Sequence, residues 1–342
     1  MTKKPKVAYL LGAGASYNAM PLVKTMPASM KTHAQHLLTF RESVPDDQQT
    51  QLNYGINMSQ AIDRYTAEMM ALVEHAETHE SVDTYAKKLF LTDNVRESFR
   101  LKLLLTIYFS HLQRPSAKMD SRYDGLLASI LAKGPEGVPR INEEVILLNW
   151  NYDLQLPLAF RPYNGDNRME ALFKGLRLVT LDDLDTYAEI PSVVHLNGMA
   201  TWKPRSSMVP VIPDECTDEL EVVKRLMEHF LHGFQHYNPQ ERLTMLRFAW
   251  DNDPNTNTGI SKLKEHLTEC EVLVVIGYSF PFFNRSVDRM VIGGMPQLRK
   301  VYLQSTSSGL KSMASAFKAI PLRDVEVETY DAVDKFMLPP EL

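Results

Sequence analysis

Four short polar segments contain the residue types that could do chemistry on a bound nucleotide. They are residues 12–16 (G-A-G-A-S), 151–153 (N-Y-D), 195–202 (H-L-N-G-M-A-T-W) and 277–281 (G-Y-S-F-P). The glycine turn at residues 12–16 is expected to lead directly into a helix. Such a turn lets the backbone approach a phosphate group, because glycine has no Cβ atom and the start of a helix offers exposed N–H groups. An amide side chain can orient a water molecule, and an imidazole can accept its proton. These residue types favour a dinucleotide as the ligand.

Each polar segment comes at the end of an apolar run that is predicted to be a buried strand. The runs are residues 7–11, 145–148, 192–196 and 272–276, and further strands are predicted at 176–181, 301–303 and 325–327. Runs that are apolar on both faces are typical of central parallel strands. With helices between them, they predict a Rossmann-like α/β fold: a parallel sheet with helices on both faces. In such sheets ligands bind beyond the carboxyl ends of the strands, where the polar segments gather.

A helical insertion, residues 28–140, is predicted within a single domain that spans residues 1–342. A helix is expected at 28–40, and apolar residues recur at helical spacing through most of 48–133. Glycine and proline predict a loop at 133–140, and polar residues predict another at 250–259.

A further helix is predicted at residues 215–236, and it contains three histidines at ligand-like spacing. His229, His232 and His236 fall at i, i+3 and i+7, roughly on one face. Because no carboxylate or cysteine is positioned to complete the shell, no metal is expected.

Composition excludes several classes of function. The chain has 342 residues, of which 44% are hydrophobic and 23% charged, as in globular proteins, and its net charge of -5 makes direct nucleic-acid binding unexpected. Its two cysteines, Cys216 and Cys270, cannot form a four-cysteine zinc site or a disulfide framework. No apolar run approaches a membrane span of about 18 residues. The basic N-terminus lacks a cleavage site, so a cytoplasmic location is expected.

A dehydrogenase is disfavoured by the residues that follow the glycine turn. The dinucleotide fingerprint needs a third glycine and an acidic residue about twenty positions further on. Tyr17 occupies the position of the third glycine, and residues 31–40 contain no aspartate or glutamate.

Taken together, the four segments resemble the sirtuin superfamily in their order and separation. The closer likeness is to prokaryotic sirtuin-like NADases of antiphage defence, whose usual pattern is G-A-G-A-S, T-T-N-Y-D, L-H-G-S-x-N-W and G-Y-S. The likeness extends from residue 7 to about residue 304 and leaves out the helical insertion. It implies an NAD+ hydrolase that takes NAD+ as its substrate, needs no metal and cleaves the nicotinamide–ribose bond. It also implies an effector that acts by NAD+ depletion.

The resemblance assigns roles residue by residue. The implied binding residues are Gly12, Ala13, Gly14 and Ser16 for the pyrophosphate, Gly277 and Ser279 for the adenosine side, and Pro21, Gly198 and Tyr278. The implied catalytic residues are Asn151 and Asp153, at the nicotinamide ribose, with His195 and Asn197. Asn197 stands where the family usually has its catalytic histidine, and His195 lies two residues earlier on the same side of a strand. The catalytic base is therefore open. Pro21 also lacks the glycine that the family has before it.

Three alternatives remain open at this point. Asn151 and Asp153 could simply cap a helix that begins near Leu154. A sirtuin deacylase would share the NAD+ site, although most members have a four-cysteine zinc module. A non-catalytic nucleotide-sensing subunit would keep the glycine turns. The apolar surface of the insertion predicts a homo-oligomer, or assembly with an ATPase or nuclease of a defence system.

Overall fold

The computed structural model describes residues 4–44, 51–52, 55–134, 137–202, 210–237, 244–251, 254–322 and 324–342. The chain divides into two compact units. The sheet unit consists of residues 1–19, 119–199 and 248–342. The helical unit consists of residues 20–118 and 200–247, and each unit is considered by itself.

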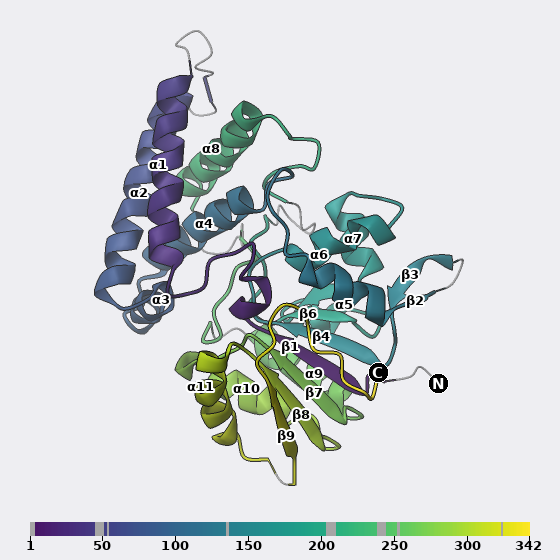
Figure 1. The fold of residues 1–342 in the computed structure, drawn as a ribbon. Coiled ribbons are helices and arrows are strands. Elements are labelled where there is room, and N and C mark those ends of the chain that lie inside the picture. Colours follow the sequence, from purple (N-terminus) through teal and green to yellow (C-terminus); the bar gives the residue numbers. More distant parts are fainter. Residues whose placement is uncertain are drawn as a thin grey trace. The chain divides into compact units, whose positions relative to one another are not determined.

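The sheet unit is built on a parallel sheet of seven strands in the order β5-β6-β4-β1-β7-β8-β9 (Figure 1). The strands are β1 (Val7–Leu11), β4 (Val145–Asn149), β5 (Leu178–Thr180), β6 (Val193–His195), β7 (Val272–Ile276), β8 (Lys300–Gln304) and β9 (Glu326–Tyr330). All six neighbouring pairs are parallel, and Val7 pairs with both Val145 and Val272. The mixed α/β, Rossmann-like fold expected from the sequence is confirmed.

Helices cover the sheet on both faces. One face, which includes Leu10 and Val275, packs on α9 (Pro254–Leu267), α10 (Arg285–Ile292) and α11 (Ser307–Lys318). On the opposite face, the Tyr9 hydroxyl donates to the Met337 carbonyl of the C-terminal segment. This segment also packs on α5 (Arg122–Ile130), since the ring of Phe336 meets the ring of Tyr123 at 5.1 Å. The sheet is therefore buried on both faces, as its continuous apolar strands require.

The remaining elements of the sheet unit are short. They are η1 (Ala13–Ser16), β2 (Leu131–Lys133), β3 (Pro139–Ile141), α6 (Gln155–Phe160), η5 (Arg161–Tyr163), α7 (Met169–Gly175), η6 (Leu184–Thr186) and η7 (Phe282–Asn284).

The helical unit has a hydrophobic core of its own. Its helices are α1 (Met26–Ser43), α2 (Met58–Thr78), α3 (Val82–Leu91), α4 (Val95–Leu112) and α8 (Glu219–Gln235). Tyr65, Ile107 and Phe230, from three different helices, are fully buried. This core buries most of the apolar helix surface from which an oligomer or a partner is predicted. The oligomer therefore stays a prediction, and this surface does not support it. No helix in the described part of the chain is long and apolar enough to cross a membrane.

Three local predictions were wrong. The loop predicted at 250–259 is interrupted by α9, which begins at Pro254, because proline fits the first turn of a helix, where its missing N–H is not needed. The loop predicted at 133–140 contains ends of β2 and β3, which pair antiparallel. The helix expected directly after the glycine turn is only the four-residue η1.

The boundaries of the helical unit also differ from the predicted insertion, residues 28–140. The unit gains a second segment, residues 200–247, which contains α8. It does not include α5, which belongs to the sheet unit. Sequence periodicity identifies helices, but it does not show which distant segments pack together.

Candidate functional site at the carboxyl edge of the sheet

The predicted polar segments meet at the carboxyl edge of the sheet. In the strand register, Leu11 is level with both Asn149 and Ile276, and Asn149 is level with His195. The chain order of the strands reverses at β1, which lies between β4 and β7. Ligands in open α/β sheets bind at such a switch point. The register thus brings the ends of four strands to the position where a site is expected.

The turns after β1 and β7 touch each other through their glycines. Gly12 N–H donates to the Ile276 carbonyl at 3.0 Å, and Gly14 N–H donates to the Gly277 carbonyl at 2.9 Å. A Cβ atom on Gly277 would lie 2.4 Å from the Gly14 Cα, and Gly277 has a φ of +60°. Close backbone contact between the two turns therefore requires these glycines.

Replacing Gly277 with alanine is expected to destabilise the protein by about 2–5 kcal/mol, because it combines backbone strain with a clash. Gly125, in the helix α5, has open space around its Cα, and alanine there should stabilise the protein by about 0.5–1 kcal/mol. Urea denaturation of the two variants measures both changes. Equal stability of Gly277→Ala and the wild type would contradict this role for the contact.

Backbone amides of the first turn are largely used inside the protein. Besides the two glycine amides, Ala15 N–H donates to the Gly12 carbonyl at 2.8 Å. These three amides do not form the phosphate cradle that a long helix would offer after the turn. The assignment of Gly12, Ala13, Gly14 and Ser16 to a pyrophosphate stays a prediction.

Asn151 joins the end of β4 to the glycine turn. Its side-chain amide donates to the Gly12 carbonyl at 2.9 Å and to the Ser16 hydroxyl at 3.3 Å. Its backbone N–H donates to the Asn149 side chain at 3.0 Å. Asn151 therefore does not cap the following helix. Its amide is held in one orientation at the edge of the sheet.

Asp153 does bind the start of α6. Its carboxylate accepts a hydrogen bond from the Gln155 N–H at 3.0 Å, so the capping interpretation holds for this residue. Burial raises the pKa of Asp153 to about 6, although a hydrogen bond from Ser16 and the Gln155 N–H lower it. A carboxylate with this pKa is mostly charged at neutral pH and becomes neutral in mild acid.

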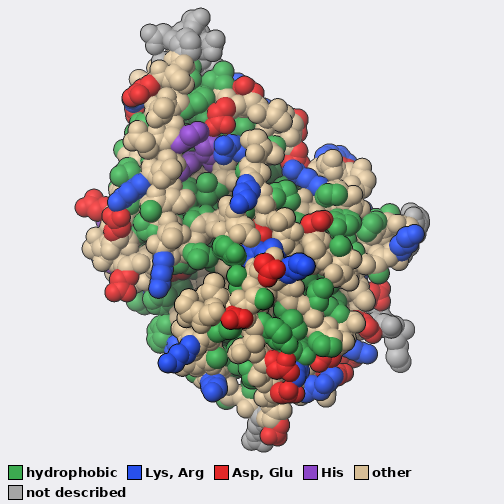
Figure 2. All heavy atoms as spheres, viewed as in Figure 1, with side chains coloured by type: hydrophobic (Ala, Val, Ile, Leu, Met, Phe, Trp, Pro, Cys, Tyr) green, Lys and Arg blue, Asp and Glu red, His purple; other side chains and the backbone are tan. Residues whose placement is uncertain are grey.

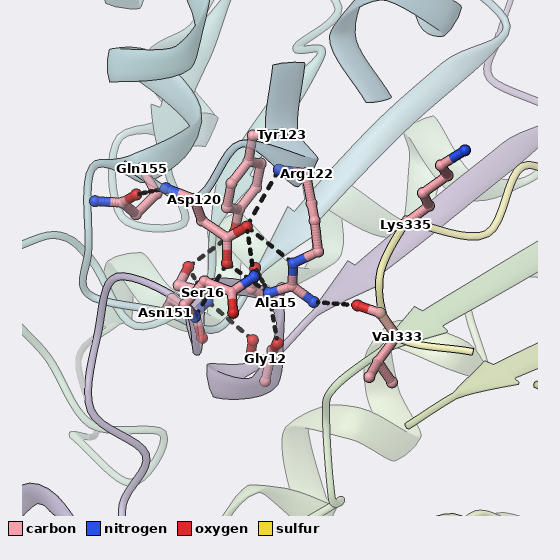
Figure 3. A network of polar contacts seen from close by, with 12 residues as sticks. Gly12, Ala15, Ser16, Asp120, Arg122, Tyr123, Asn151, Gln155, Val333 and Lys335 are labelled. Carbon is pink, nitrogen blue, oxygen red and sulfur yellow. Dashed lines mark hydrogen bonds and ion pairs between the residues drawn. The ribbon is translucent and has the colours of Figure 1, made fainter. Parts of the chain in front are cut away.

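Ser16 is the centre of a buried polar network that extends beyond the predicted residues (Figure 3). Its hydroxyl contacts the Tyr123 hydroxyl at 2.9 Å and the Asn151 amide. Nearby, Arg122 forms a buried ion pair with Asp120 at 2.5 Å. The Arg122 guanidinium also donates to the carbonyls of the turn residues Gly14, at 3.2 Å, and Ala15, at 3.0 Å. This network fixes the backbone of the first turn.

Sequence reasoning missed Asp120, Arg122 and Tyr123, because they fall in the segment assigned to the helical insertion. Their signal is the sequence D-S-R-Y-D at residues 120–124, which places an acid and a base two positions apart. The same spacing occurs in the exposed pair of Asp166 and Arg168. The pattern alone therefore does not distinguish a buried pair from a surface pair.

His195 is fully buried at the end of β6. Its Nδ1–H donates to the Asn151 carbonyl at 3.2 Å, and its Nε2 accepts from the Asn149 amide at 3.4 Å. Burial lowers the pKa of His195 to about 4. The ring is thus neutral, and both of its nitrogens are engaged. This geometry suits a residue that positions Asn151 better than a general base.

Asn197 offers a hydrogen-bond acceptor without a partner. Its Oδ1 atom is buried and has no hydrogen bond within the residues that the structure describes. Gly198 follows with a φ of +68°, which turns the chain away from the strand. A buried acceptor without a partner costs about 1–3 kcal/mol, so a water molecule or a ligand that donates to this atom would be stabilising.

The turn after β7 presents its residues in opposite directions. Tyr278 is buried, where its hydroxyl donates to the Asp288 carboxylate at 3.0 Å and its ring stacks on Trp150 at 5.7 Å. Ser279 is exposed, and the buried Phe280 has a φ of +51°. Of the predicted binding residues in this turn, Ser279 faces solvent, whereas the buried Tyr278 contacts the core. Pro21 belongs to the helical unit.

Of the three predicted histidines, His229 and His232 lie on α8, whereas His236 directly follows its last residue, Gln235. His229 meets the Trp202 ring at 5.2 Å, and its Nδ1–H donates to the Arg225 carbonyl. The ring of His232 lies 5.0 Å from that of His236. In the described part of the chain, these histidines are not among the groups that could hold a metal ion.

Comparison with known proteins adds no assignment to this site. No protein-family model matches the chain, and no curated protein is a significant match to it. The function is therefore inferred from the arrangement at the carboxyl edge of the sheet and from the sequence resemblance of the four segments.

Proposed function

We propose that the protein is an NAD+ hydrolase that cleaves the nicotinamide–ribose bond to give nicotinamide and ADP-ribose. The observation that carries this proposal is the unpaired Asn197 Oδ1, which follows β6 at the same sheet edge as Asn151. A ribose hydroxyl or an attacking water molecule could donate the hydrogen bond that this oxygen lacks. Asn197 also occupies the place of the family's catalytic histidine in the resemblance.

Cleavage of this bond requires few general acids or bases in the site. Nicotinamide already carries a positive charge in NAD+, so it leaves without being protonated, and positioning dominates the catalysis. The oxocarbenium-like transition state is cationic. The Asp153 carboxylate would supply a negative charge that stabilises a developing cation, and its burial would strengthen this interaction. Asn151 and Asn197 would orient the ribose and the water, and His195 holds Asn151.

A nucleotide-sensing subunit without hydrolytic activity is a second candidate. The engaged, neutral His195 favours it, because the structure gives this ring no proton-accepting nitrogen for a water molecule. The glycine amides of the first turn also favour this candidate, because they donate hydrogen bonds to carbonyls within the protein. Both candidates place NAD+ at the carboxyl edge of the sheet, and they differ in whether the bond breaks.

The biological role follows from the resemblance. An enzyme of this kind would act as an effector of antiphage defence by depleting cellular NAD+. Assembly with further copies, or with an ATPase or nuclease, would then set its activity.

NAD+ cleavage is expected to fall below about pH 6, because protonation of Asp153 removes the charge that stabilises the cation. On this acid limb of the pH profile, the rate should fall about tenfold per pH unit, as expected when one group titrates. Initial rates of nicotinamide release between pH 4.5 and 8 measure this limb. Asp153→Asn should lower the rate and abolish the limb.

Asp288 provides the matched control for this pH profile. Burial raises its pKa to about 7, but its partner is the core residue Tyr278. Asp288→Asn should therefore keep an acid limb near pH 6. If the limb disappears in Asp288→Asn and remains in Asp153→Asn, the role given to Asp153 is wrong.

A further inference from the structure

A cluster of two histidines and one carboxylate lies in the helical unit and takes no part in the proposed reaction. His36 belongs to α1, His111 to α4 and Glu219 to the first turn of α8. One ligand atom from each side chain lies within 4.8 Å of the others, and within the described residues no other group of this kind is found. Figure 2 shows histidine at the surface over α1, with acidic and basic side chains beside it.

The spacing of these atoms is close to that of a first-row transition-metal site. The His111 Nε2 lies 3.3 Å from the Glu219 Oε1, and the His36 Nε2 lies 3.9 Å from the same oxygen. Bonds of about 2.0–2.1 Å in tetrahedral geometry place two ligand atoms about 3.4 Å apart. His111 and Glu219 already have this separation. His36 is half-exposed, so its side chain can move closer to the Glu219 oxygen and to His111, whose ligand atom lies within 4.8 Å of its own.

A second set of residues holds the ring of His111 from behind. The His111 Nδ1 lies 3.0 Å from the His33 Nδ1, and the His33 Nε2 lies 3.0 Å from the Tyr65 hydroxyl. When the His111 Nε2 binds a metal, its Nδ1–H can donate to His33, whose Nε2–H then donates to Tyr65. Metal-binding histidines almost always use their second nitrogen in this way.

The carboxylate is oriented in a comparable manner. Arg114 lies 3.4 Å from the Glu219 Oε2, which leaves Oε1 toward the two histidines. The positive charge of Arg114 offsets part of the negative charge of Glu219, so the set prefers an ion that imidazole binds well over one that needs several carboxylates.

We propose that His36, His111 and Glu219 bind one divalent first-row transition ion, with Zn²⁺ the best match to two imidazoles and one carboxylate. This metal is not expected from the sequence, since the three residues come from helices that are far apart in the chain. Three protein ligands leave a fourth position for water. The ion would link α1, α4 and α8, and so tie residues 20–118 to residues 200–247. No residue of this cluster belongs to the proposed NAD+ site.

Isothermal titration of the full chain with ZnCl₂ tests this proposal. We expect one Zn²⁺ per chain and a rise in the thermal midpoint at saturation, because the ion binds the folded state only. His36→Ala and Glu219→Gln should each weaken Zn²⁺ binding about tenfold to a hundredfold or more, since loss of a ligand costs at least as much as loss of a supporting residue. Both side chains are partly exposed, so these variants should fold. Mg²⁺, which prefers oxygen ligands, should not raise the midpoint.

His236→Ala is the matched control, because His236 is an exposed histidine elsewhere in the same unit. It should bind Zn²⁺ as the wild type does. The proposal is wrong if His36→Ala binds Zn²⁺ with unchanged affinity, or if His236→Ala loses as much affinity as His36→Ala. Neither readout uses NAD+, so failure here would leave the proposed hydrolase untouched.

Discussion

Alanine in place of Asn151 is expected to lower the turnover of NAD+ by about a hundredfold or more, as when a positioning group is lost. The side chain holds the Gly12 carbonyl and the Ser16 hydroxyl from the end of the neighbouring strand. Its removal would leave both the turn and the reacting ribose less well oriented. Steady-state nicotinamide release measures the change in kcat, and the melting temperature shows that the variant is folded.

Asn142→Ala is the matched control for this substitution. Asn142 is an exposed asparagine at the opposite, amino end of β4, and its side chain accepts from the Glu144 N–H. Its loss should leave turnover unchanged. A folded Asn151→Ala protein with normal turnover would remove Asn151 from the site.

Arg122→Met should be the most destabilising of the substitutions considered, by about 3–5 kcal/mol. The change removes the guanidinium and leaves the Asp120 carboxylate buried without its counter-charge, which is the costly way to break a buried ion pair. It also removes donors to the Gly14 and Ala15 carbonyls of the first turn. Chemical denaturation monitored by circular dichroism gives the free energy of unfolding.

Two further variants distinguish the effect of burial on stability from the effect of charge. Arg168→Met breaks an ion pair with Asp166 that has the same spacing in sequence but is exposed, and it should have no measurable effect. The double variant Asp120→Asn/Arg122→Met should recover part of the stability, because the buried carboxylate is then neutral. If Arg122→Met and Arg168→Met unfold at the same denaturant concentration as the wild type, the buried pair does not support the turn.

Most of the sheet is predictable from the sequence, because each central strand is a continuous apolar run. β7 was predicted with the residues it has, Val272–Ile276. The edge strand β9 is less apolar, yet its predicted position at 325–327 overlaps the observed Glu326–Tyr330. The start of α9 was missed, because its first residues, P-N-T-N-T, have the composition of a loop.

The site is only partly predictable, for a different physical reason. Asn151 and Asp153 follow β4, and His195 is the last residue of β6, so the parallel topology alone places them at one edge. Whether each side chain faces the turn, the helix or the interior depends on packing that local sequence does not encode. Asn151 binds the turn, Asp153 the helix α6, and His195 the backbone of Asn151. Arg122 reaches the first turn across about a hundred residues of sequence, and no local pattern reports such a contact.

The most direct test of the proposed function is to incubate the full chain with NAD+ and to quantify nicotinamide, ADP-ribose and remaining NAD+ by chromatography. Parallel samples should contain an acyl-lysine peptide or the Asn151→Ala variant, and calorimetry on the same preparation should measure NAD+ binding. If the protein is a hydrolase, nicotinamide and ADP-ribose should form in equal amounts, and they should form without the peptide. The Asn151→Ala variant should form them far more slowly. Saturable binding of NAD+ that stays intact would contradict hydrolysis and favour the sensing subunit, and release that requires the peptide would indicate a deacylase.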